Sequence, residues 1–151
     1  MKLSQGVEWG AHCAVTLARV EPGLSLSRRT LAERYALPEA YLAKHLKAMV
    51  NAGLLHATTG PNGGFRLAKR PEDITMLDVV EAIEGPVPRF VCQEIRQRGT
   101  AGLAPEDCVA RCGVDSAMEA AKEAWRESLR GVTVAALVAR LPPAARGPVT
   151  P

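Results

Sequence analysis

Residues 27–53 read SRRTLAERYALPEAYLAKHLKAMVNAG, which is the pattern of two helices joined by a tight turn. Ser27 is a favourable N-cap for a first helix that ends near Tyr35, and Pro38 suits the first position of a second helix, which stops at Gly53. The second helix has an apolar stripe on one side and polar or cationic residues on the other. This arrangement predicts a helix-turn-helix, although another kind of helical hairpin would have a similar pattern.

A β-hairpin is predicted directly after this motif. Residues 54–59 and 65–68 read as short strands, and the tip GPNGG at residues 60–64 has the composition of a turn. Glycines let the backbone approach a sugar-phosphate chain closely, and Arg66 and Lys69 are placed to neutralise phosphates. Because the hairpin follows a helix-turn-helix, we interpret it as a DNA-binding wing; the alternative is a plain surface hairpin.

The charge distribution also favours a nucleic-acid partner. The chain of 151 residues has a net charge of +3. Residues 1–70 hold ten Lys and Arg against four Asp and Glu, a balance of +6, whereas residues 71–151 hold nine against twelve, a balance of −3. Phosphate contacts require cations that are clustered on one surface. The 47% hydrophobic content predicts one globular domain with an appendage.

Several classes of protein are not expected from the sequence. No apolar run is long enough to span a membrane, and residues 1–10 lack the pattern of a cleavable signal, so we expect a cytoplasmic protein. The chain has no phosphate loop, no cofactor fingerprint and no nucleophile with a base and an orienting group. An enzyme with a small-molecule substrate is therefore not expected.

Further helices are predicted on either side of the winged motif, at residues 4–20, 75–85, 115–130 and 133–141. The Gly- and Pro-rich tail, residues 142–151, is expected to be disordered. The helix at residues 115–130 is amphipathic, and its apolar stripe could be covered by the matching helix of a partner subunit. That stripe consists of Met118, Ala121, Trp125 and Leu129.

Two pairs of metal-ligand residues occur at a spacing of four. Glu8 and His12 lie in the first helix, and Cys108 and Cys112 are expected on a short helix that Gly113 ends. Residues four apart on a helix project from one face about 5 to 6 Å apart, so each pair could bind one iron atom. A cluster of two irons and two sulfides needs both pairs, which would have to meet within one chain or across a dimer.

Other interpretations of these four residues stay open. Glu8 and His12 could be a local polar pair at the border of a helix, and the cysteines could be unrelated. The same four side chains could also bind zinc, which accepts tetrahedral nitrogen, sulfur and oxygen ligands.

Several motifs of the chain resemble a known family. The opening MKLS, the helix LPEAYLAKHLKAMVNAGLL, the wing GPNGGFRLAKRPEDIT and the run LDVVEAIEGP are similar to the iron-sulfur winged-helix transcription regulators that include IscR, NsrR and RirA. The resemblance implies a mainly α fold with a small β wing, in which a winged helix-turn-helix domain is joined to a long dimerisation helix. It also implies a homodimer with a cluster that controls binding to palindromic promoter sites in double-stranded DNA.

The cysteine spacing departs from that of the commoner members, which have three cysteines close together. The motifs GVEWGAHC and FVCQEIRQRG, with the later cysteine pair, are more similar to the redox-sensing subgroup of RsrR. That resemblance implies a 2Fe-2S cluster bound by Glu8 and His12 of one subunit and by Cys108 and Cys112 of the other. Cys92 stands at the place of the first family cysteine, so it is an alternative ligand in place of Glu8, or else a buried thiol.

Trp9 is adjacent to Glu8 in the sequence, and its large side chain could respond when a cluster is oxidised or reduced. Our hypothesis is that its ring reorients with redox state; the alternative is that it simply packs at an interface.

The DNA-binding residues are predicted on three segments. The start of the first helix of the motif suits phosphates, the first turns of the second suit base edges, and the wing suits the backbone and minor groove. Thr59 stands where family members often carry an Arg that reads the minor groove, and Asn62 is the candidate to replace that Arg. The residues are Arg28, Arg29, Thr30, Glu39, Ala40, Tyr41, Lys44, His45, Thr59, Gly60, Asn62, Gly63 and Arg66.

The predicted function is that of a homodimeric DNA-binding transcription regulator, switched by the redox state of a 2Fe-2S cluster. The alternative is a winged-helix regulator without a cluster, which senses thiol oxidation or is stabilised by zinc. The predicted segments are a winged helix-turn-helix domain at 1–85, a cluster-binding loop and short helix at 86–114, the dimerisation and final helices at 115–141, and the disordered tail at 142–151.

Overall fold

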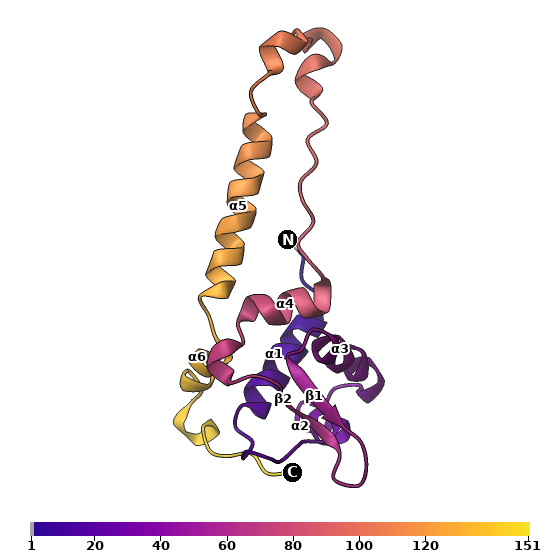
Figure 1. Ribbon diagram of the computed structural model, residues 1–151, viewed down its shortest axis with the longest axis vertical. Coiled ribbons are helices and arrows are strands. Elements are labelled where there is room, and N and C mark those ends of the chain that lie inside the picture. The colour runs from indigo at the N-terminus through magenta and orange to yellow at the C-terminus, as the bar shows by residue number, and fades with distance from the viewer. Residues whose placement is uncertain (1) are drawn as a thin grey trace. The chain divides into compact units, whose positions relative to one another are not determined.

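The computed structural model describes residues 2–151, apart from the side chain of Ala101. The chain divides into two compact units, and each is described by itself. The first consists of the residues up to Pro86 together with Leu129–Pro151, and the second of Val87–Ser128. The first unit contains α1 (Gln5–Leu17), α2 (Arg28–Arg34), α3 (Glu39–Asn51), β1 (Leu55–Thr58), β2 (Gly64–Leu67), α4 (Met76–Glu84) and α6 (Val134–Ala139) (Figure 1).

The turn between α2 and α3 follows from local sequence signals. The Ser27 hydroxyl accepts a hydrogen bond from the backbone N–H of Thr30 at 2.9 Å, and this cap starts α2. Ala36 has φ of 50°, the left-handed conformation that ends the helix, and Pro38 is the N-cap of α3 rather than its first residue. The predicted helix-turn-helix is confirmed, with one residue of difference at this boundary.

The wing is a two-stranded antiparallel sheet in which Leu55 pairs with Leu67 and Thr58 with Gly64. One residue of the α1–α2 connection joins its edge, because Leu26 and Phe65 exchange backbone hydrogen bonds of 3.0 and 2.8 Å. A side chain at Gly64 would collide with the backbone of Leu26. Glycine is therefore required where the wing meets this connection.

The core of the first unit lies around α1. Its buried side includes Ala14 and Leu17, which belong to one apolar cluster with residues of α2, α3, α4 and α6. A capping box of Thr75 and Asp78 starts α4 as predicted, and Thr133 caps α6. The large side chains without solvent exposure include Leu26, Leu31, Leu42, Leu46, Met49, Ile74, Val79 and Val134.

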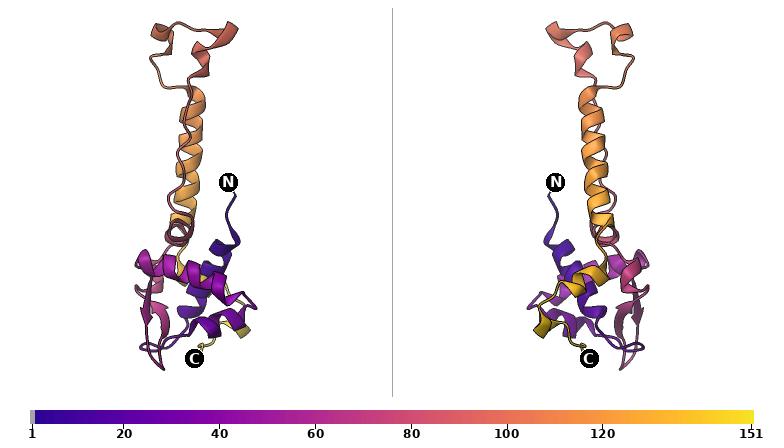
Figure 2. Two further views of the ribbon diagram at one scale, coloured as in Figure 1. Left: turned by 90° about the vertical axis from the view of Figure 1, so that its right-hand side faces the viewer. Right: turned by 90° about the vertical axis from the view of Figure 1, so that its left-hand side faces the viewer.

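The second unit contains α5 (Gly113–Arg130, ending two residues beyond the unit) and the 3-10 turns Ile95–Gln97, Gly99–Ala101 and Pro105–Cys108. Figure 2 shows α5 as one uninterrupted helix. The predicted fold class, mainly α with a small β wing and a long helix, is confirmed. Over the described residues, no helix has both the length and the apolar character needed to cross a membrane.

The prediction that one short helix carries Cys108 and Cys112 is wrong. Cys108 ends a 3-10 turn, and Cys112 directly precedes α5, where its carbonyl accepts the N–H of Ser116 at 3.0 Å. Gly113 therefore begins the long helix instead of ending a short one. The acidic first turn around Asp115 favours a helix start at this place, because carboxylates stabilise helix N-termini.

The prediction of a disordered tail at residues 142–151 is also wrong. Pro143–Ala145 forms a 3-10 turn, and Val149 is 4% exposed within the core cluster. The Val149 N–H donates to the carbonyl of Arg19 at 3.0 Å. A segment of this composition is expected to be disordered because it buries too little apolar surface to offset the entropy lost on ordering. Here the burial of Val149 and its backbone hydrogen bond offset that entropy.

Candidate functional site

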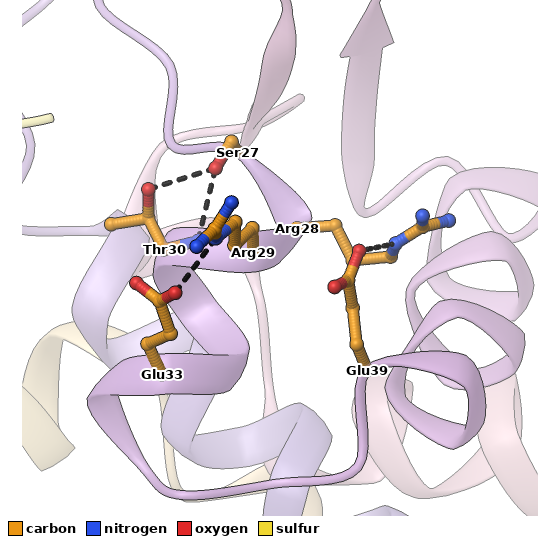
Figure 3. A network of polar contacts seen from close by, with 6 residues as sticks. All are labelled: Ser27, Arg28, Arg29, Thr30, Glu33 and Glu39. Atoms are coloured by element: carbon orange, nitrogen blue, oxygen red, sulfur yellow. Dashed lines mark hydrogen bonds and ion pairs between the residues drawn. The ribbon is translucent and has the colours of Figure 1, made fainter.

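The start of α2 carries a network of polar contacts beside the start of α3 (Figure 3). The hydroxyls of Ser27 and Thr30 lie 2.8 Å apart, and Arg29 donates to the carboxylate of Glu33 at 2.7 Å. Both side chains of this ion pair are largely exposed. An exposed guanidinium at the start of a helix is suited to a phosphate group, since the surface pair costs little to break.

Arg28 and Glu39 connect the two helices of the motif. The Arg28 Nε donates to Glu39 Oε1 at 2.8 Å, and the two side chains are 50% and 44% exposed. Arg28 is the first residue of α2 and Glu39 the first of α3, so the contact spans the turn. Each side chain therefore has a protein partner that a phosphate or a base edge would have to replace or share.

The exposed face of α3 contains most of the residues predicted for base contacts. Ala40 and Lys44 are exposed, and the Tyr41 side chain is 68% exposed. On the wing, Thr59, Gly60, Asn62 and Arg66 are exposed, and Gly63 is half-buried.

His45, predicted to contact base edges, instead has its ring directed toward α1. Its ring lies edge-on to Trp9 of α1, with the ring centres 5.8 Å apart and an angle of 83° between the planes. A side chain at Gly6 would collide with the same ring. His45 thus belongs to the contact between α1 and α3. Burial lowers the pKa of its imidazole, the charge of Lys44 adds to this effect, and Glu84 opposes it.

Glu8 and His12 are exposed neighbours on α1, as the spacing predicts. Both line a mainly apolar groove of about 420 Å³ between α1 and α6, with Val15, Leu137 and Leu141 among its other walls. They also line a smaller hollow of about 200 Å³, formed with Trp9, Tyr35 and Leu37. A carboxylate and an imidazole at the border of two hollows are accessible for a ligand that approaches from outside.

The backbone and ring of His12 contact the end of α2. The Tyr35 hydroxyl donates to the carbonyl of His12 at 3.3 Å, and the two rings lie 5.5 Å apart between centres. The same hydroxyl lies 2.6 Å from that of Thr16, which is fully buried. The helix that carries the predicted ligands therefore packs against α3 and contacts the C-cap residue of α2.

Three thiols of the second unit share one polar environment. Backbone N–H groups of Asp115 and Val114 donate to the Cys112 sulfur and lower its pKa, and the thiol of Cys92 and the charge of Arg96 add to this. The pKa of Arg96 is raised, first by its hydrogen bonds to Glu94 and further by Cys108 and Cys112. Cys108 and Cys92 are half-buried, so the interpretation of Cys92 as a fully buried thiol is not supported.

Arg96 was not singled out from the sequence. Its guanidinium donates to Glu94 Oε2 at 2.8 Å and to the carbonyl of Ala110 at 3.2 Å, so it joins the segment of Cys92 to the segment of the later thiols. A Glu-x-Arg spacing in a polar loop is too common to indicate this role. Only the tertiary contact with the 105–112 segment reveals it.

The donor set has the chemistry of an iron or zinc site, with a carboxylate, an imidazole and thiols. Among the residues that the structure describes, no group of three or more His, Cys, Asp and Glu side chains is arranged to bind a metal ion. The predicted carboxylate and imidazole ligands lie in the first unit, and the predicted thiol ligands lie in the second. Cys13 belongs to neither group of ligands, because it is fully buried in the core and burial raises its pKa to about 12.

Comparison with known proteins identifies the family. Residues 3–140 match the Rrf2 family, which is described as iron-dependent transcriptional regulators. The chain belongs to the Rrf2 family.

Relatives of this Rrf2 protein include YffB of Lactococcus lactis, whose name assigns it to the HTH-type transcriptional regulators. It is 35% identical over 135 residues, which cover 89% of this chain and 85% of YffB. The solved structure of CymR, the global cysteine regulator of B. subtilis, has a TM-score of 0.71 at 24% identity and covers 94% of this chain and 99% of its own. The structure of T. potens IscR has a TM-score of 0.70 at 24% identity, with coverages of 96% and 91%.

The Rrf2 assignment confirms the coarse functional prediction. The chain is a DNA-binding transcription regulator and not an enzyme. The similarity to CymR and IscR shows the fold alone, because both identities are below 25%. The resemblance to the IscR family is confirmed at this level.

Proposed function

We propose that this Rrf2 regulator acts in the cytoplasm as a homodimer, and that the redox state of a 2Fe-2S cluster switches its binding to palindromic promoter sites. The proposed ligands are Glu8 and His12 of one subunit with Cys108 and Cys112 of the other, as in the subgroup of RsrR. Cys92 is the alternative to Glu8.

The observation that carries this proposal is the position of Glu8 and His12. They are exposed on α1, which packs against α3 and contacts Tyr35, the C-cap residue of α2. The carbonyl of His12 accepts from Tyr35 at the end of α2, and Trp9 meets His45 of α3. A change of charge at these two side chains would therefore act on residues that touch both helices of the DNA-binding motif.

The thiols fit the other half of the ligand set. A bound cluster would supply one electron that can be gained or lost, which changes the local charge by one unit. The N–H groups at the start of α5 and the guanidinium of Arg96 stabilise a thiolate at Cys112. Ligands must be deprotonated to bind metal, so this environment favours metal binding at Cys112.

Two apolar surfaces support the homodimer. The groove between α1 and α6 exposes apolar side chains next to Glu8 and His12. On α5, Val114 is 61% and Met118 is 46% exposed. A second copy of α5 would cover these side chains with apolar side chains of the same kind. The proposed ligand pairs would then meet between subunits.

The test is anaerobic purification with iron and sulfide assay, followed by visible spectra of Glu8→Ala, His12→Ala, Cys108→Ala and Cys112→Ala proteins. Each substitution should abolish or strongly change the spectrum. Gel shifts of the oxidised and reduced forms should then differ in DNA affinity. A colourless protein that contains zinc, or a cluster that survives in Glu8→Ala and is lost in Cys92→Ala, would contradict the ligand assignment.

One observation favours a second function, a thiol switch without a cluster. The Cys92 thiol donates to the Cys112 sulfur, and the pKa of Cys112 is lowered from its ordinary value. A peroxide could therefore oxidise this pair to a disulfide, with loss of two electrons and two protons from the thiols. Mass spectrometry after treatment with peroxide distinguishes the two functions. Loss of two mass units in the metal-free protein, with a change in DNA affinity that Cys92→Ser removes, supports the thiol switch.

A further inference from the structure

The last residues of the chain are bound to the connection that leads from α1 to α2. The guanidinium of Arg19 donates to the carbonyl of Gly147 twice, from Nη2 at 2.6 Å and from Nε at 3.1 Å. In the other direction, the Val149 N–H donates to the carbonyl of Arg19, and Val149 forms a parallel bridge with Val20. We name residues 147–151 the C-terminal strap.

The connection is held at both of its ends. The strap binds it at Arg19 and Val20, directly after α1, whereas the wing binds it at Leu26, directly before α2. Between these points, Gly23 has φ of 88° and Leu24 is exposed. A short segment with fixed ends has few conformations, so the strap restricts where α2 begins relative to the wing.

The end of the strap reaches the DNA-binding residues themselves. A pocket of about 420 Å³ lies where the connection, the start of α2 and the wing tip meet. Its walls include the polar side chains of Ser25, Thr30 and Asn62, and Pro151 closes one side. Thr30 is a predicted contact to phosphate, and Asn62 is a predicted contact to the minor groove. The strap therefore ends beside two separate parts of the reading surface.

We propose that the C-terminal strap is a positioning element for DNA binding, which fixes the distance between the start of α2 and the wing tip. The family match ends at residue 140, so the strap lies outside the part of the chain that defines the family. The proposal needs only the DNA binding of the family. It does not depend on the cluster or on the thiols.

Two substitutions and a deletion test the strap in the full-length protein. Arg19→Gln removes both hydrogen bonds to Gly147, Val149→Ser weakens the buried anchor, and the deletion removes residues 147–151. Arg146→Gln is the matched control for Arg19→Gln, because the Arg146 Nε donates to the carbonyl of Leu141 at 2.7 Å, within the tail alone. Thr150→Ala, at an exposed residue, is the control for Val149→Ser.

The probe is a DNA duplex that the unmodified protein selects from a randomised library. Each strap variant should bind it about tenfold more weakly, and each control should stay within about twofold of the unmodified protein. The dissociation constant is corrected for the folded fraction from circular dichroism. Its dependence on salt should keep the same slope, because no phosphate contact is removed. The Leu26 amide, which donates to Phe65, should exchange its hydrogen faster.

Three outcomes would overturn the proposal. The first is an unchanged affinity in folded Arg19→Gln and in the deletion. The second is an equal loss in Arg19→Gln and Arg146→Gln, which would reveal an effect of charge alone. The third is a salt slope lowered by about one in Arg19→Gln, which would make that residue a direct phosphate contact. The visible spectrum and the redox response should stay unchanged in all variants. A loss of DNA affinity in the strap variants can then be distinguished from a failure of the proposed cluster.

Discussion

The hydroxyl oxygens of Thr16 and Tyr35 lie 2.6 Å apart and join the last turn of α1 to the residue that caps the C-terminus of α2. Thr16 has no solvent exposure, and the Tyr35 hydroxyl donates a hydrogen bond to the carbonyl of His12 at 3.3 Å. A buried hydroxyl is costly without a partner, so this contact fixes α2 against the helix that carries Glu8 and His12.

Tyr35→Phe should destabilise the protein by about 1 to 2 kcal/mol, because the buried Thr16 hydroxyl loses its partner. Denaturation in urea measures the effect. The double variant with Thr16→Val is the control, since it removes both polar groups. Its loss should be smaller than the sum of the two single losses, and strict additivity would mean that the two hydroxyls do not interact in solution.

Trp9→Ala should leave a cluster in place but reduce the difference in DNA affinity between oxidised and reduced protein. The reason is that Trp9 contacts His45 of α3 and lies next to the proposed ligand Glu8. Gel shifts of both redox forms measure the ratio. Trp9→Phe, which keeps an aromatic ring, should retain part of it. An unchanged ratio in Trp9→Ala would leave Trp9 as a packing residue only.

Arg28→Gln should weaken binding to all duplex sequences and lower the slope of log affinity against log salt by about one, as expected when one phosphate contact is lost. Arg98→Gln removes the same charge from the second unit and is the control. A loss of affinity for one sequence only, with the slope intact, would assign Arg28 to base recognition.

Acid should destabilise the protein partly through His45. Its pKa is lower in the folded protein than its ordinary value of 6.5, because burial and Lys44 disfavour the charged ring more than Glu84 favours it. The unfolded chain therefore takes up the proton first. The stability from His45 is complete above pH 6.5 and is lost as the pH falls toward the lowered value. As the pH falls over this range, the denaturation midpoint of His45→Gln should decrease less than that of the unmodified protein. An equal decrease in both proteins would show that His45 does not cause the acid sensitivity.

Local signals in the sequence were sufficient for most element boundaries. Ser27, Gly53 and the capping box of Thr75 act on backbone groups within four residues, so their effect does not need the rest of the fold. Gly113 shows the limit of such signals. A glycine can follow a helix or precede one, and the choice depends on which neighbouring segment gains more from packing and hydrogen bonds.

The candidate site was predictable in part. The spacing of Glu8 and His12 places both on one exposed face of α1, because a helix has a fixed period. The same spacing failed for Cys108 and Cys112, where the backbone is not a continuous helix. His45 has the polarity of a surface residue, yet Trp9 and Gly6 provide space for its ring in the contact of two helices.

The sequence by itself determined the helix-turn-helix and the wing, since periodicity, caps and turn residues act over short distances. The tertiary structure alone decided that Tyr35 bonds to Thr16, that Arg96 joins the segments of three thiols, and that Val149 fixes the tail beside α1. These contacts link residues far apart in the chain. Their formation depends on burial and on which distant group is within reach, and neither quantity is encoded in any local stretch.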